Sequence, residues 1–326
     1  MGYNKKNYAR IRAEYQTKFL KAHAEADRRT AELHQKSAEL AEIDRALAQT
    51  GVEIAMAALG TGEEYQTKLA AVEKKNTELQ ARRAALLENM GYPADYTVPP
   101  YECPKCKDSG FVDVKMCDCM RRDLIMAAYA SSGLGALMQT QSFDNFDLSF
   151  YKDNEKNYVL MKDTLEQAKK YAEQFSLNSG NLIFLGKTGL GKTHLSTAVA
   201  RCVIDRGFDV YYTGAIEMFE DFERARFGYG EERREAGEAL ERYTECDLLI
   251  LDDLGAETVN QFTTSCLYAV LNNRINMKKP TIISTNLTGP EIKERYAERI
   301  SSRIFGEFSA RNFLGSDIRR QKLSRK

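Results

Sequence analysis

The sequence lacks three features that would each point to a particular class of protein. It has no run of about 18 apolar residues, so no membrane-spanning helix is expected. Its first residues, MGYNKKNYARIRAEYQ, contain no apolar core of the kind found in a secretory signal. Its 47 basic and 47 acidic residues balance, which excludes a strongly basic nucleic-acid binder but allows a local basic patch. We therefore expect a cytoplasmic protein without a membrane partner.

Proline is absent between residues 4 and 89, where strong helix formers dominate. Apolar residues recur there every seven positions, and a similar pattern resumes after Gly60-Thr61-Gly62. This predicts a long helix, a turn and a shorter antiparallel helix, with Gly51 as a point where the first helix could end earlier. Such a hairpin either packs on the rest of the chain or forms an arm that grips a partner protein. The repeating positions are Phe19, Ala26, Leu33, Leu40, Leu47 and Ile54.

Four of the seven cysteines crowd into 17 residues, after prolines that end the helical region. They form a C-x-x-C pair, Cys103 and Cys106, and a tighter C-x-C pair, Cys117 and Cys119. Two pairs this close favour one tetrahedral Zn²⁺ site with four thiolate ligands, which would be structural because no position is left open for chemistry. The alternative to a Zn²⁺ site is that two of these cysteines form a redox-active pair.

Residues from 153 onward alternate between helical and short apolar patterns, which predicts a parallel sheet with helices on both faces. The expected strands are 181–185, 209–213, 247–251 and 281–285. Together these patterns predict a helical arm or coiled-coil hairpin over residues 1–90, a zinc-binding module over 91–130, a linker over 131–150 and an α/β domain over 151–326.

The stretch GKTGLGKT, residues 186–193, fits the phosphate-loop pattern G-x-x-x-x-G-K-[ST] between a predicted strand and a predicted helix. Its glycines let backbone amides turn toward phosphates, and the helix directs its positive N-terminal end at the same anion. Lys192 is expected to reach the β- and γ-phosphates of a nucleoside triphosphate, and Thr193 to ligate Mg²⁺. The expected nucleotide-binding residues of this stretch are Gly186, Lys187, Thr188, Gly189, Leu190, Gly191, Lys192, Thr193 and His194.

Polar residues follow two later strands, where they could complete the site. Asp252, at the end of the strand LLIL, is expected to hold Mg²⁺, and Asp253 to orient the attacking water. The short side chain of Asp253 makes slow hydrolysis plausible. Asn286 could hydrogen-bond that water or the γ-phosphate, although asparagine is also common in turns. An arginine of the stretch RISSR, Arg299 or Arg303, could act across a subunit boundary or lie on the surface.

The ordered motifs GKTGLGKTHL, LLILDDLG, TIISTN, ERISSRIF and GSDIRR resemble those of the DnaC/DnaI helicase loaders and the related transposase helpers of the IstB type. The resemblance covers roughly residues 143–320. It implies an α/β fold of the AAA+ P-loop class with a five-stranded parallel sheet. It also implies that AAA+ domains of several copies associate in an ATP-dependent way. The implied roles are Walker A for Lys192 and Thr193, Walker B for Asp252 and Asp253, sensor 1 for Asn286, arginine finger for Arg303 with Arg299 as second candidate, and a recurrent site arginine for Arg319.

The same resemblance implies partners, namely a DnaB-like hexameric helicase and single-stranded DNA. In this clade a helical insertion lines the DNA path, and here it would be Glu217 to Phe227, with Phe222, Arg224, Arg226 and Phe227 as contacts. An amphipathic core helix explains the phenylalanines equally well. DnaI-like loaders also carry a zinc module before the ATPase, whereas IstB-like helpers, which act on duplex DNA, usually lack one. We therefore favour a loader that uses ATP, Mg²⁺ and Zn²⁺, with the transposition helper as the alternative.

Overall fold

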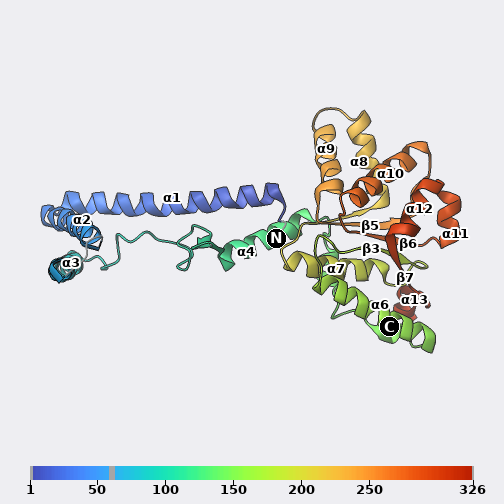
Figure 1. Ribbon diagram of the computed structural model, residues 1–326, viewed down its shortest axis with the longest axis horizontal. Helices are drawn as coiled ribbons and strands as arrows, with labels where there is room; N and C mark the ends of the chain where they lie inside the picture. The colour runs from blue at the N-terminus through green and yellow to red at the C-terminus, as the bar shows by residue number, and fades with distance from the viewer. Residues whose placement is uncertain (1–2, 59–62, 325–326) are drawn as a thin grey trace. The chain divides into compact units, whose positions relative to one another are not determined.

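The computed structural model describes residues 3–58 and 63–324, which divide into two compact units (Figure 1). One unit, here called the helical unit, comprises Arg12–Met120. The other, here called the C-terminal unit, combines the first residues up to Ile11 with the chain from Arg121 onward. The N-terminal residues thus cluster with the C-terminal unit, a grouping that the predicted boundary at residue 90 did not anticipate.

The helical unit is built on α1 (Lys5–Lys36), α2 (Ala38–Ala58) and α3 (Glu63–Asn89). The predicted first helix ends at Lys36, because the Ser37 hydroxyl accepts a hydrogen bond from the Leu40 amide (3.2 Å) and so caps the start of α2. Gly51, where we predicted a possible end, lies inside α2. The predicted break at Gly60-Thr61-Gly62 lies outside the described residues. Leu33, Leu40 and Leu87 form a fully buried cluster where the three helices meet.

Two short strands, β1 (Phe111–Val112) and β2 (Lys115–Met116), pair antiparallel within the cysteine region. The helix α4 (Asp118–Ser131) follows. Asn7 of α1 donates to the Ser131 hydroxyl at the end of α4 (2.8 Å), and Asn4 donates to the Asp209 carboxylate (3.2 Å). These bonds hold the first turn of α1 within the C-terminal unit.

The C-terminal unit contains a five-stranded parallel sheet in the order β4-β5-β6-β3-β7. The strand β6 lies between the strand before the phosphate loop and the strand that carries the acids. The predicted five-stranded parallel sheet is thereby confirmed. The strands are β3 (Asn181–Leu185), β4 (Val210–Gly214), β5 (Leu248–Leu254), β6 (Thr281–Thr285) and β7 (Phe308–Asn312). The helices are α5 (Leu137–Thr140), the 3-10 turn η1 (Leu148–Tyr151), α6 (Glu155–Glu173), α7 (Lys192–Asp205), α8 (Ala215–Phe227), α9 (Gly230–Glu245), α10 (Gln261–Asn276), α11 (Gly289–Arg295), α12 (Glu298–Glu307) and α13 (Ile318–Ser324).

Alternate residues of the strands face two separate cores, as the two-residue period of a strand requires. Phe184 and Ile250 pack with the apolar faces of α6 and α7. Ile183 and Leu251 pack on the other side with α8, α10 and α12. The sheet is therefore the middle layer of three, and its carboxyl-terminal edge presents the loops that follow each strand (Figure 1). In the described ranges, no helix has the length and apolar character needed to cross a membrane.

Candidate nucleotide site and cysteine cluster

The phosphate loop leaves β3 at Leu185 and enters α7 at Lys192. Gly189 and Gly191 have φ of 81° and 83°, in the left-handed region that favours glycine. A Cβ atom on Gly189 would also lie 2.1 Å from the Asp317 carboxylate, which approaches from the segment before α13. Both the backbone conformation and this close approach therefore explain why glycine stands here.

Lys192 lies at the start of α7 with its side chain folded back over the loop. Its ammonium donates to the carbonyl oxygens of Gly186 (2.6 Å) and Lys187 (2.9 Å). Burial lowers the pKa of Lys192, while Asp253 and Asp252 oppose that shift. An anion held by the loop would give this ammonium a stronger acceptor than two carbonyl groups.

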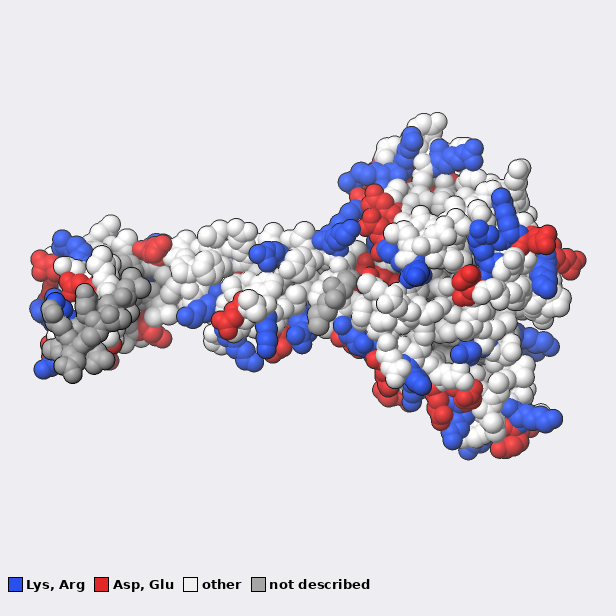
Figure 2. Space-filling view, in the orientation of Figure 1, with Lys and Arg blue, Asp and Glu red and all other residues white. Residues whose placement is uncertain are grey.

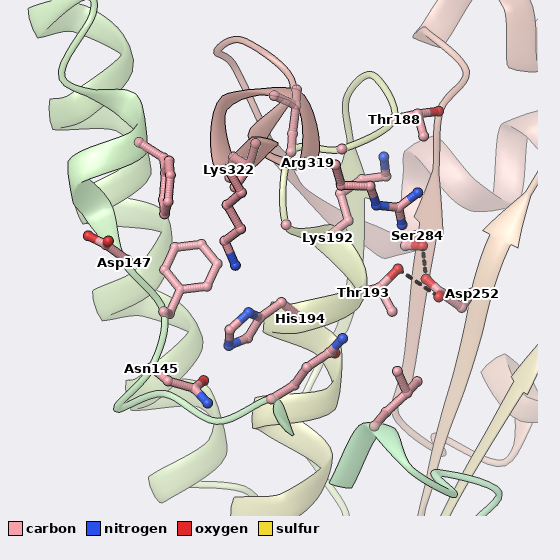
Figure 3. A pocket seen from close by; sticks show the side chains of 18 of the residues that line it. Asn145, Asp147, Thr188, Lys192, Thr193, His194, Asp252, Ser284, Arg319 and Lys322 are labelled. Atoms are coloured by element: carbon pink, nitrogen blue, oxygen red, sulfur yellow. Dashed lines mark hydrogen bonds between the residues drawn. The ribbon is translucent and has the colours of Figure 1, made fainter. Parts of the chain in front are cut away.

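The carboxylate of Asp252 accepts three hydrogen bonds from three different elements. Thr193 of α7 (2.9 Å) and Tyr212 of β4 (2.5 Å) both donate to its Oδ2 atom, and Ser284 of β6 donates to Oδ1. Figure 3 shows Thr193 and Ser284 both joined to the Asp252 carboxylate by hydrogen bonds. The predicted pair of Thr193 and Asp252 is thus brought together. Sequence reasoning missed Tyr212 and Ser284, although both lie near the carboxyl ends of strands that flank β5.

Tyr212 is buried, and that burial, with Asp252 beside it, raises the pKa of its hydroxyl. Replacement Tyr212→Phe is expected to lower the rate of ATP hydrolysis about tenfold, because one hydrogen bond that orients the carboxylate is lost. ATP affinity should change little, since the phosphate loop is untouched. Tyr211→Phe is the matched control, because Tyr211 packs in the opposite core. Equal hydrolysis rates for both variants would refute a positioning role for Tyr212.

Asp253 and Asn286 differ in their relation to this site. Asp253 is exposed, lines the cavity and has a left-handed φ of 55°, with its amide donating to Ser284 (3.1 Å). Asn286 is exposed beside Gly255 and does not line the cavity, whereas Ser284, two residues earlier, does. The sensor role of Asn286 stays a prediction.

A cavity of about 490 Å³ opens beside the phosphate loop. Part of its wall comes from residues 137–151, so the segment that we predicted as a linker also shapes the site. His194 faces this segment, with Nε2 2.9 Å from the Ser142 carbonyl and its ring against Phe146, and burial lowers its pKa. Arg319 and Lys322 of α13 line the same cavity (Figure 3).

Arg299 and Arg303 lie on α12 and do not line the cavity of their own chain. Both guanidinium groups stack over the ring of Tyr268, each 4.6 Å from its centre. Arg303 also donates to Asn272 (2.8 Å) and to the Tyr268 hydroxyl (3.0 Å). A role for either arginine at a nucleotide therefore requires a second copy of the chain, as the arginine-finger prediction does.

The four clustered cysteines bring their sulfur atoms within 4.8 Å of one another. The Sγ atoms of Cys103 and Cys117 are 3.9 Å apart, and those of Cys106 and Cys119 are 3.5 Å apart. Four thiolates around a tetrahedral Zn²⁺ lie about 3.8 Å apart, so the donor set and its spacing fit this metal. Hydrogen bonds led by the Cys106 backbone lower the pKa of Cys103 to about 7, whereas burial raises the pKa of Cys106.

A buried carboxylate organises the backbone around these cysteines. Asp108 accepts hydrogen bonds from the amides of Glu102 (2.8 Å) and Cys103 (2.7 Å). The adjacent β1–β2 hairpin returns the chain, and the Cys117 amide donates to the Gly110 carbonyl (2.9 Å). Local hydrogen bonds therefore shape the backbone that presents the four cysteines.

The hairpin of α8 and α9 presents aromatic and basic side chains, and Figure 2 shows basic side chains over it. Phe227 and Tyr229 are 64% and 88% exposed. Arg226 stacks over the Phe227 ring (5.1 Å). Phe222 packs on Tyr243 at the edge of the core, as the alternative of an amphipathic core helix expects, and its contact with DNA stays a prediction. Arg224 pairs with Asp221 and remains on the exposed face.

The family model described as IstB-like ATP binding protein matches residues 121–299, more than half of the chain. This chain belongs to that family. The predicted membership of the group that includes DnaC-type and IstB-type proteins is confirmed, and the C-terminal unit is an AAA+ ATPase domain.

Several relatives resemble parts of the chain. The replicative helicase loader DnaC of Escherichia coli (strain K12) is 26% identical over 173 residues, which cover 53% of this chain and 66% of that protein. The phage-like element PBSX protein XkdC of Bacillus subtilis (strain 168) is 28% identical over 252 residues, which cover 72% of this chain and 89% of that protein. A crystal structure of the DnaC helicase loader matches with a TM-score of 0.48 and 19% identity, over 55% of this chain and all of that one.

Proposed function

We propose that this protein is an ATP-dependent helicase loader, which binds a hexameric replicative helicase and single-stranded DNA and switches between states as ATP is bound and hydrolysed. The observation that carries this proposal is the assembled nucleotide site, in a domain whose relatives include proteins named replicative helicase loader. The cysteine cluster and the helical unit upstream support it, because they add a separate folded part that is suited to binding a partner.

In this proposal Lys192 binds the β- and γ-phosphates, while Thr193 and Asp252 hold Mg²⁺. Bound Mg²⁺ would neutralise charge on the phosphates. Asp253 lines the same cavity and would orient the attacking water. An aspartate is shorter than a glutamate, so it reaches less far toward that water. We therefore expect slow hydrolysis that depends on assembly or DNA.

Replacing Arg303 tests whether this residue acts at the nucleotide of a neighbouring copy of the chain. Arg303→Ala is expected to leave ATP affinity of the isolated chain unchanged and to lower hydrolysis in the assembled state at least about tenfold, because a neighbouring cation stabilises the transferring phosphoryl group. Hydrolysis is measured as a function of protein concentration, with nucleotide binding measured in parallel. The same measurements are made on Arg299→Ala, because Arg299 is the second candidate for the arginine finger. Full activity of Arg303→Ala with loss in Arg299→Ala would assign the finger to Arg299.

The α8–α9 hairpin is the DNA contact that we propose. Exposed aromatic rings stack on bases of a single strand, and nearby arginines neutralise phosphates. Phe227 and Tyr229 are exposed for stacking, and Arg224 and Arg226 lie on the same hairpin. This assignment adds Tyr229 to the predicted contacts.

The second candidate is a transposition helper that acts on duplex DNA. One support is the description of the matched family as IstB-like ATP binding protein. A second is that this chain is 25% identical over 191 residues to the insertion sequence IS232 putative ATP-binding protein of Bacillus thuringiensis subsp. berliner. ATP-dependent filaments on duplex DNA, with no preference for single strands, would favour this candidate. We rank it second because the helical unit with its cysteine cluster lies outside the family match.

The loader proposal is tested by co-purification with a replicative helicase from the same organism. The full chain should retain the hexameric helicase on a column. A variant with the cysteine cluster disrupted, Cys103→Ser with Cys106→Ser, should retain much less, while still binding ATP. Absence of helicase binding by the full, ATP-binding chain would refute the loader function.

A further inference from the structure

Two consecutive carbonyl groups of the phosphate loop accept hydrogen bonds from residues outside it. The Tyr151 hydroxyl, at the end of η1, donates to the Leu190 carbonyl (2.8 Å). The Ile318 amide, at the start of α13, donates to the Gly189 carbonyl (2.9 Å). One donor precedes the loop in the chain and the other follows it, and neither belongs to the G-x-x-x-x-G-K-[ST] pattern. The loop is therefore held by contacts that its own motif does not specify.

These two bonds also fix the direction of the amides that follow in the loop. In a trans peptide the carbonyl and the next amide point in opposite directions, and no peptide of the described residues is cis. A Leu190 carbonyl that faces Tyr151 therefore turns the Gly191 amide away from Tyr151. In the same way, the bond from Ile318 to Gly189 turns the Leu190 amide away from α13. Such loop amides are the groups that cradle the α- and β-phosphates of a nucleotide.

Tyr151 is fully buried against the loop. A Cβ atom on Gly191 would lie 3.0 Å from the Tyr151 hydroxyl oxygen, and a Cβ atom on Gly315 would lie 3.1 Å from the Tyr151 ring. The ring thus fits between the phosphate loop and the segment that leads into α13. Burial raises the pKa of the Tyr151 hydroxyl, so this group keeps its proton and remains a donor.

The Leu190 carbonyl has little access to water as a substitute donor, because Leu190 is only 3% exposed. Removing the Tyr151 hydroxyl would leave a buried acceptor without this bond, which is unfavourable enough to let the peptide turn. We propose that the Tyr151 hydroxyl and the Ile318 amide together position the phosphate loop for nucleotide binding. The inference deepens the proposed function, since it rests on this loop binding a nucleoside triphosphate.

Tyr151→Phe tests the inference, because it removes the hydroxyl and keeps the ring. Isothermal titration of the full chain with Mg²⁺ should show ATP and ADP both bound about tenfold more weakly, by the same factor, since both carry the α- and β-phosphates. The maximal rate of hydrolysis at saturating ATP should change less than about twofold, because Thr193 and Asp252 are untouched. This pattern is the reverse of the one expected for Tyr212→Phe.

Tyr171→Phe is the matched control. The Tyr171 hydroxyl also donates to a backbone carbonyl, that of Gly180 (3.0 Å), and its ring packs against the same core. Gly180 precedes β3 and does not line the cavity, so this variant should bind both nucleotides as the unmodified chain does. Unchanged affinity in Tyr151→Phe, or equal losses of affinity in the two variants, would overturn the inference.

Ile318 gives a second test that leaves the Tyr151 hydroxyl in place. Ile318→Pro removes the amide hydrogen, and proline is tolerated at the first residue of a helix. Ile318→Ala removes the side chain but keeps the amide, so it is the control. Ile318→Pro should bind ATP about tenfold more weakly than Ile318→Ala, and equal affinities would overturn the inference. An unmodified chain that binds no nucleotide would refute the proposed function and this inference together, whereas a chain that binds ATP but no helicase would refute only the proposed function.

Discussion

Replacing Lys192 with alanine is expected to weaken ATP binding about 100-fold or more and to stop ATP turnover. Lys192 is the one lysine of the loop whose side chain lines the cavity, and its ammonium already lies against the loop backbone. A charge-assisted hydrogen bond to phosphate contributes more than a neutral one, and in the proposed site this side chain binds two phosphates. Isothermal titration with ATP and a phosphate-release assay measure the two effects.

Lys187→Ala is the matched control for this experiment. Lys187 lies in the same loop, is exposed and does not line the cavity. Its replacement removes one positive charge from the loop but no expected phosphate contact, so binding should change little. Undiminished turnover in Lys192→Ala would show that the loop does not serve as the phosphate site.

Replacing Cys106 with serine is expected to abolish stoichiometric zinc binding and to unfold the region around residues 103–119. Metal analysis of the unmodified chain should find about one Zn²⁺ per chain. Structural zinc contributes on the order of 10–16 kcal/mol of apparent binding free energy in zinc-finger peptides, far more than the local hydrogen bonds here can replace. Proteolysis within residues 103–119 should therefore accelerate in the variant or on addition of a chelator.

Cys202→Ser is the control for the zinc experiment. Cys202 lies in α7 and is not one of the four clustered cysteines, so its loss should leave the zinc content unchanged. A folded, metal-free chain whose cleavage is insensitive to chelator would contradict the four-thiolate site and would favour the redox alternative.

The phosphate loop and the cysteine cluster were predictable because their chemistry depends on short spacings along the chain. The strands β3, β4, β5 and β6 were predictable because each contains a short run of apolar residues. The fifth strand, β7, was missed because its sequence, FSARN, is mostly polar, which an edge strand tolerates. The end of the first helix was missed because the cap at Ser37 depends on one hydroxyl within an otherwise unbroken helical pattern.

The other features that the sequence did not predict depend on contacts between segments that are far apart along the chain. Tyr212 and Ser284 reach Asp252 only because β4, β5 and β6 are neighbours in the sheet, a juxtaposition that no local motif records. The segment 137–151 has the composition of a linker, and its place in the cavity wall comes from tertiary packing against α7. Phe222 and Phe227 have the same side chain, and only the fold distinguishes the partly buried ring of Phe222 from the exposed ring of Phe227.

The central claim, that this protein loads a helicase onto single-stranded DNA, is tested most directly by a loading assay. A hexameric replicative helicase is mixed with closed circular single-stranded DNA carrying an annealed oligonucleotide, and strand displacement is followed with and without the full chain. We predict that the chain with ATP increases displacement, and that Cys103→Ser with Cys106→Ser abolishes the increase. No increase by a chain that binds ATP and contains zinc would contradict the account.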